Sequence, residues 1–222
     1  LEIVDEENNL TGKTEERDIV HAKGLWHREI AVWIMNEKGE VLLQKRSPNK
    51  KQGANNWSTS CAGHIDIGEE PIKSAIREIR EELGIPVKED DLKHLFTAKN
   101  KRVLTNSFNN IFCYLYFLKV NTPIEEFTID TEEVSEIKYI LFEEFEQLVK
   151  DKPANAPFTA REYMPAIVEE LRKNFKSANR RYFGKFCEFR GMSFEKTDDV
   201  SAFKKMLSNT EQRQHISLRG EN

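Results

Sequence analysis

Alternating hydrophobic and polar residues predict several short strands along the chain. Residues 1–20 are expected to form two short strands joined near Asn8 and Asn9, with a turn at Gly12. A clearer hairpin comes next, in which apolar runs at 30–35 and 41–43 flank a glycine-containing turn. Further strands are predicted at about 57–62, 92–98, 111–120 and 137–142.

Three segments have the spacing of amphipathic helices. Residues 70–83 place their apolar side chains within one narrow arc, which we expect to face the core: Ile72, Ile76, Ile79 and Leu83. Pro71 suits the first turn of this helix, and Gly84 ends it. Residues 141–150 and 160–175 are also predicted to be helical. Strands interspersed with helices, some of the strands joined as hairpins, favour an α/β (α+β) fold with a mixed sheet.

The chain length and composition suit one sizeable domain with an appendage. We predict a domain over 1–176, beginning with a β-hairpin at about 1–26, and a partly disordered C-terminal extension over 177–222. The segment Arg180–Arg190 of this extension is basic and aromatic. Its composition suits either contact with a partner or packing on the domain.

Charge and cysteine content exclude some classes of function. A formal net charge of -4 gives no electrostatic reason to expect binding to nucleic acid or to an anionic membrane. No apolar run approaches the length of a membrane span, and the first residues lack a signal pattern. Cys61, Cys113 and Cys187 lack metal-type spacing, so we expect buried, reduced thiols in a cytoplasmic protein.

Three carboxylates crowd the outer face of the predicted helix 70–83. Glu78, Glu81 and Glu82 have i, i+3, i+4 spacing, so their side chains converge and repel one another. A solvated face, tied by pairs such as Arg77–Glu81, is one interpretation. A divalent-cation site is the other, since Mg²⁺ and Mn²⁺ prefer carboxylate oxygen.

Residues upstream decide between these interpretations. Gly63 precedes Glu69 by five intervening residues, and seven more lead to the run REIREELGI, which starts at Arg77. This pattern resembles the complete Nudix box. The resemblance implies an α/β/α sandwich with a mixed sheet and an enzyme that cleaves a phosphoanhydride with Mg²⁺ or Mn²⁺. In that pattern Glu78, Glu81 and Glu82 match metal ligands.

The resemblance also assigns roles to the rest of the motif and to nearby loops. Gly63 offers a backbone carbonyl to the metal, Glu69 supports the loop and the metal shell, and Arg77 orients a glutamate. The general base in this family is a box glutamate or one from a later loop. Here the loop candidates are Glu132, Glu133 and Glu136. Arg46 or Lys45 can meet phosphates, and we expect Arg46, His64 and Glu133 in the substrate site.

A closer resemblance lies outside the box, over roughly residues 1–175. The stretches VHAKGLWHREIAVWIMNEKGEVLLQKRS and NNWSTSCAGHIDIGE are similar to the Nudix branch that includes type I isopentenyl-diphosphate isomerase. His27 and His64 match two of that isomerase's metal-binding histidines, whereas His21 falls one residue away from the third. Its catalytic cysteine corresponds to Ala62, next to Cys61.

The isomerase resemblance is therefore incomplete. The isomerase's later glutamates fall near Phe108 and Asn110, which can play neither of their roles. We therefore predict a hydrolase acting on a small-molecule diphosphate, such as a nucleoside diphosphate derivative, and a homodimer is possible. The alternatives are isomerase-like activity and a non-catalytic ligand-binding module.

Overall fold

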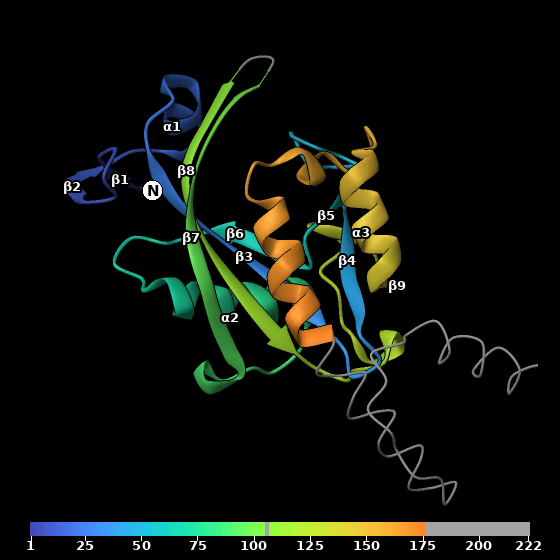
Figure 1. Cartoon of the computed structure of the whole chain (residues 1–222). Coiled ribbons are helices and arrows are strands. Elements are labelled where there is room, and N and C mark those ends of the chain that lie inside the picture. The colour runs from blue at the N-terminus through green and yellow to red at the C-terminus, as the bar shows by residue number, and fades with distance from the viewer. Residues whose placement is uncertain (105–106, 176–222) are drawn as a thin grey trace, which may run out of the picture. The chain divides into compact units, whose positions relative to one another are not determined.

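A mixed β-sheet with helices on both faces makes up the part of the chain that the structure describes, residues 1–104 and 107–175 (Figure 1). In this computed structural model the strands have the order β5-β4-β3-β8-β7, with β6 also pairing β3 and β9 also pairing β4. The strands of this sheet are β3 (His27–Met35), β4 (Glu40–Arg46), β5 (Trp57–Ser58), β6 (Cys61–His64), β7 (Leu92–Leu104), β8 (Ser107–Lys119) and β9 (Val134–Leu141). The predicted mixed α/β fold is confirmed.

The centre of the sheet is the parallel pair β3 and β8. Their register runs from His27 opposite Ile111 to Met35 opposite Lys119. Both strands are apolar and largely buried, as expected for parallel strands covered on both faces. Strand β8 also pairs antiparallel with β7, which makes the sheet mixed.

Helices cover the two faces of the sheet and enclose separate cores. Helix α2 (Pro71–Leu83) packs with Ile30, Val32 and Leu118 on one face. Helix α3 (Phe142–Asp151) and a further helix over 164–175 pack on the other face, around Trp33. Figure 1 shows α2 on the opposite side of the strands from these two helices. The sheet therefore has a helical layer on each side.

The predicted hairpin at 30–43 forms, but its two strands separate soon after the turn. Met35 opposite Val41 is the one residue pair in register between β3 and β4. Strand β6 then pairs with β3, and β9 pairs with β4 along its whole length. The single strand predicted at 57–62 is accordingly two strands, because β5 pairs β4 while β6 pairs β3.

The N-terminal prediction is right for the two strands and wrong for the residues after them. Strands β1 (Glu2–Val4) and β2 (Leu10–Thr14) form a hairpin, but Gly12 lies inside β2 at φ +74° rather than in the turn. The hairpin ends well before residue 26, since residues Arg17–Lys23 form helix α1. Gly24 closes α1 in the left-handed conformation and leads the chain into β3.

Other predictions concern chain ends and cysteines. The boundary at 176, the extension 177–222 and Cys187 lie outside the described residues. Cys61 and Cys113 are buried free thiols, as expected. Within the described segments, no helix combines the length and the apolar character needed to cross a membrane.

Candidate active site

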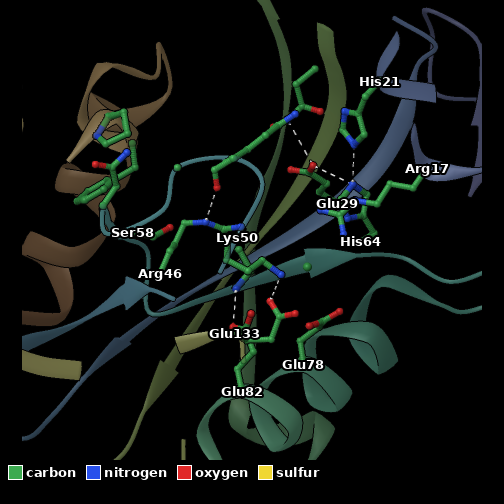
Figure 2. Close-up of a pocket in the computed structure, with 18 of the residues that line it drawn as sticks. Arg17, His21, Glu29, Arg46, Lys50, Ser58, His64, Glu78, Glu82 and Glu133 are labelled. Carbon is green, nitrogen blue, oxygen red and sulfur yellow. Dashed lines mark hydrogen bonds and ion pairs between the residues drawn. The ribbon is translucent and has the colours of Figure 1, made fainter. Parts of the chain in front are cut away.

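The carboxylates of α2 face a cavity of about 550 Å³. Glu78, Glu81 and Glu82, which we call the glutamate wall, all line it. Their environments differ, because Glu82 is 4% exposed while the Glu81 side chain is 54% exposed. Figure 2 shows Glu78 and Glu82 rising from α2 on the same side of this cavity. The opposite arc of α2 buries Ile79 and Leu83, so the predicted orientation of the helix is correct.

Gly63 lies directly against the glutamate wall. A Cβ atom built on Gly63 would overlap the carboxylate of Glu78. The backbone of β6 can therefore approach Glu78 closely only if residue 63 has no side chain. The family resemblance implies that the carbonyl of Gly63 is a metal ligand, and the structure places residue 63 beside the Glu78 carboxylate.

Arg77 holds the loop and the glutamates together. Its guanidinium donates to Glu69 Oε2 at 3.0 Å, Glu78 Oε1 at 2.8 Å and Glu81 Oε2 at 3.1 Å. It also donates to the backbone oxygen of His64 at 3.2 Å. Glu69 in turn accepts a bond from Ser74 Oγ at 2.6 Å. Arg77 is thus a positioning residue, and Glu69 anchors the loop that precedes α2.

Burial raises the proton affinity of the inner carboxylates. The pKa of Glu82 rises to about 7, chiefly because the group is buried and also because Glu78 is near. The Cys61 thiol and the Ala62 amide, which donates to Glu82 Oε2 at 3.3 Å, offset only part of the effect of burial on this pKa. The pKa of Glu78 is raised for the same main reason. Clustered, partly desolvated carboxylate oxygens suit Mg²⁺ or Mn²⁺, whose charge would offset their repulsion.

One of the three later glutamates reaches the cavity. Glu133 lines it and forms an ion pair with Lys50. Glu136 instead pairs with Lys45 at 3.4 Å, and Glu132 is exposed outside the lining. The structure therefore separates the three loop candidates and leaves Glu133 beside the glutamate wall (Figure 2).

Basic side chains line the same cavity as the glutamate wall. Arg46 lines it, whereas its neighbour Lys45 does not, as alternation along β4 requires. Arg17 and Lys50 also line it, and neither was predicted. Arg17 belongs to the unpredicted helix α1, and Lys50 lies in a polar loop without periodicity. We call Arg17, Arg46 and Lys50 the basic wall.

Three histidines from separate elements converge beside the cavity, and two of them, His21 and His64, line it. His21 of α1, His27 of β3 and His64 of β6 place one ring nitrogen each within 4.8 Å of the others, and we call them the histidine cluster. His27 Nδ1 lies 3.0 Å from the Leu25 oxygen, so Nδ1 carries the proton and donates it. His27 Nε2 is buried without a hydrogen-bond partner among the described residues. Backbone carbonyls that fix the outer nitrogen in this way are typical of metal-binding histidines.

The histidine cluster corrects one prediction. His21 was expected to miss the third position of the isomerase pattern, yet its Nε2 lies 3.3 Å from His64 Nε2. Glu29, which was not predicted, lies 3.3 Å from His64 Nε2 through Oε1. Burial lowers the pKa of His21, and it lowers that of His64 to about 4, so both are neutral near pH 7. Neutral imidazoles with a neighbouring carboxylate can hold a transition metal.

The positions that correspond to the isomerase's catalytic residues carry other chemistry. Ala62 lines the cavity, whereas the Cys61 side chain is buried in the core on the α2 face. Burial, and next the charge of Glu82, raises the pKa of Cys61 well above its usual value, so the thiol stays protonated. Asn110 donates to the Gly24 oxygen at 2.7 Å, and Phe108 offers its backbone oxygen to His21 at 3.2 Å.

Comparison with known proteins agrees with this geometry. A model of the NUDIX domain matches residues 25–161. Nudix hydrolase 3 of Arabidopsis thaliana is 34% identical over 166 residues, which are 71% of this chain but only 21% of the plant protein. An isopentenyl-diphosphate Delta-isomerase of Pectobacterium atrosepticum is 32% identical over 71% of this chain and 84% of its own length.

A solved structure supports the same fold. The crystal structure of DR0079 from Deinococcus radiodurans superimposes with a TM-score of 0.57 at 20% identity, covering 78% of this chain and 97% of that one. Hydrolases and isomerases of the Nudix type are both among the relatives. The family model, the two relatives and the shared fold together establish that this chain belongs to the Nudix family.

Proposed function

We propose that this protein is a Mg²⁺- or Mn²⁺-dependent hydrolase that cleaves a phosphoanhydride bond of a nucleoside diphosphate derivative or a related diphosphate. The supporting observation is that the glutamate wall and the basic wall line one and the same cavity. A diphosphate needs cations on its oxygens before water can attack, and this cavity supplies both basic side chains and ligands for metal.

Each wall has a separate role in the proposed reaction. Arg17, Arg46 and Lys50 bind and orient the phosphate oxygens. Glu78, Glu81 and Glu82, with the Gly63 carbonyl, would hold the divalent cation, and Glu69 keeps their loop in place through Arg77. When bound, the cation draws electron density from the phosphoryl oxygens and acidifies an attacking water.

In the proposed reaction a glutamate acts as the general base. The water oxygen bonds to one phosphorus, the bridging P–O bond breaks, and the leaving phosphate keeps the electron pair. The proton of the water passes to a carboxylate. A carboxylate oxygen of the glutamate wall that does not bind the cation can accept this proton. Glu133, which lines the same cavity, is the alternative base.

A substitution series tests the proposal. Wild-type protein is screened against diphosphate substrates with Mg²⁺ and Mn²⁺, and phosphate and pyrophosphate release are read separately. Glu81→Gln and Glu82→Gln should each lower turnover by roughly a hundredfold or more, because an essential ligand or base is lost. Glu132→Gln is the matched control, since that side chain is exposed outside the cavity. Unchanged metal-dependent hydrolysis in Glu82→Gln would refute the proposal.

Isomerase-like activity is a second candidate, which the histidine cluster favours. Ala62 argues against it, because the cavity then lacks a thiol at the position where the isomerase has its cysteine. Incubation with isopentenyl diphosphate in D₂O separates the two activities. Isomerisation incorporates deuterium into the carbon skeleton, whereas hydrolysis of the phosphoanhydride releases phosphate and leaves isopentenyl phosphate without any exchange.

A further inference from the structure

Two arginines that belong to neither the glutamate wall nor the basic wall also line the cavity. Arg102 lies on β7, and Arg161 comes directly after the short helix Pro157–Ala160. Arg102 is opposite Asn109 in the β7–β8 register, so these two side chains lie on the same face of the hairpin. Asn109 Nδ2 in turn donates to Glu29 Oε1 at 3.4 Å. The pairing thus places Arg102 on the cavity side of the sheet.

Neither guanidinium is neutralised within the protein. Among residues 1–104 and 107–175, no carboxylate oxygen lies within 4 Å of Arg102 or Arg161. Arg161 donates to the Tyr163 hydroxyl at 2.6 Å, which is a neutral acceptor. Its Nε–H is buried and has no hydrogen-bond partner in the described part of the chain. A buried donor on a charged group is costly to leave unpaired.

The positive charges of the two arginines also repel each other. The pKa of Arg102 is lowered, first by burial and then by the charge of Arg161. The carboxylate that acts on both of them is Glu29, but its Oε1 already lies 3.3 Å from His64 and accepts from Asn109. Two desolvated guanidiniums that share one engaged carboxylate leave a positive charge in the cavity. An incoming anion would compensate that charge.

We infer that Arg102 and Arg161 form a second anion-binding subsite, which takes a phosphate or carboxylate group on the substrate remote from the diphosphate. The planar fork of a guanidinium suits either group, because both present oxygen pairs at matching spacing. This inference rests on the proposed function, since the glutamate and basic walls take the diphosphate itself. The favoured substrates are therefore diphosphates that carry an additional acidic group.

Paired substrates that differ by one remote anionic group test the subsite. ADP-ribose is compared with its 2′-phosphate, and UDP-glucose with UDP-glucuronate, so that the two pairs separate phosphate from carboxylate. Hydrolysis with Mg²⁺ gives kcat/KM for each member, and equilibrium binding in EDTA gives affinities without turnover. The variants are Arg161→Met, Arg161→Lys and Arg102→Met. Lys101→Met is the control, because Lys101 is the exposed neighbour of Arg102 and does not line the cavity.

Wild-type protein should prefer the more acidic member of at least one pair by about tenfold or more, the effect expected of a charge-assisted hydrogen bond. Arg161→Met and Arg102→Met should abolish that preference and change the other member little, while Lys101→Met should retain it. Arg161→Lys should keep part of it. The subsite is refuted if wild-type protein has equal kcat/KM values and equal affinities for both members of each pair. Equal losses on both members in the arginine variants would also overturn it.

The two assays distinguish this inference from the proposed function. If no diphosphate is hydrolysed but binding still shows a preference that Arg102→Met removes, the subsite stands and the hydrolase proposal fails. If hydrolysis occurs without any preference, the hydrolase proposal stands and the subsite fails. Thermal unfolding of each variant is measured first, and Arg102→Met decides the outcome if Arg161→Met is unfolded.

Discussion

The glutamate wall and the histidine cluster share one cavity but are built in opposite ways. The glutamate wall comes from a single turn of α2, and Arg77 bridges two of its members. The histidine cluster comes from α1, β3 and β6, with His27 fully buried. Carboxylates concentrate negative charge that a hard cation would offset, whereas neutral imidazoles can stay together without a metal. Two sets of side chains of the kinds that can bind metal ions therefore lie side by side.

The largest expected effect concerns the close approach of β6 to the glutamate wall. Gly63→Ala places a methyl group where the Glu78 carboxylate lies, so that carboxylate must move. A displacement of about 1 Å can cost roughly a hundredfold in rate, and we expect a loss of that order in kcat/KM. The histidine cluster should be unaffected. Near-normal turnover with a normal unfolding temperature would show that Glu78 has no fixed role.

The histidine cluster is tested by a metal that prefers nitrogen ligands. Wild-type protein should bind Co²⁺ with a visible absorption band from imidazole coordination, and His27→Gln should weaken that binding by roughly tenfold or more. His94→Gln is the matched control, because His94 lies on β7 outside the cavity. A Co²⁺ spectrum that is identical in wild type and His27→Gln would mean that the cluster does not bind metal.

The smallest expected effect is a pH dependence of the protein's stability that comes from the glutamate wall and not from the histidine cluster. In metal-free protein the pKa of Glu82 is raised from 4.5 to about 7, so between these values the folded state holds a proton that the unfolded chain lacks. The stability that this proton contributes is complete below about pH 4.5 and is lost as the pH rises through 7. The total change is on the order of 3 kcal/mol.

Thermal unfolding in EDTA from pH 4.5 to 8 measures this contribution. The difference in stability between wild type and Glu82→Gln should shift against wild type as the pH rises, and saturating Mg²⁺ should reverse the shift. The His27→Gln protein should keep the same pH dependence as wild type. If the difference in stability between the two proteins does not vary with pH, Glu82 is not the group that titrates.

The same contrast explains what the sequence predicts and what it misses. Helix α2 and its carboxylates are contiguous, so periodicity and spacing predict their shared face correctly. The position of the His21 side chain depends on the unpredicted helix α1 and on the left-handed turn at Gly24. Counting residues along the sequence does not capture either feature. Spacing alone therefore places His21 outside the cluster that the fold completes.

The sequence does not predict the polar cavity residues Arg102, Asn109, Glu29 and Arg161, for a related reason. Strands β7 and β8 extend over residues 99–104 and 107–110, well beyond their predicted ends. Arg102 and Asn109 lie in this extension, where side chains face a cavity rather than an apolar core. Hydrophobic alternation is lost there, so the strand signal ends early. Glu29 and Arg161 carry no local signal at all, because their role depends on contacts between distant elements.

The proposed hydrolysis requires that water attack a diphosphate at the glutamate wall. The most direct measurement traces ¹⁸O from labelled water into the products, with Mg²⁺ and the preferred diphosphate, for wild type and Glu82→Gln. We predict that wild type incorporates one ¹⁸O atom for each anhydride cleaved, and that Glu82→Gln incorporates almost none in the same time. Equal incorporation by the two proteins, or no labelled phosphate from any diphosphate, would contradict the account.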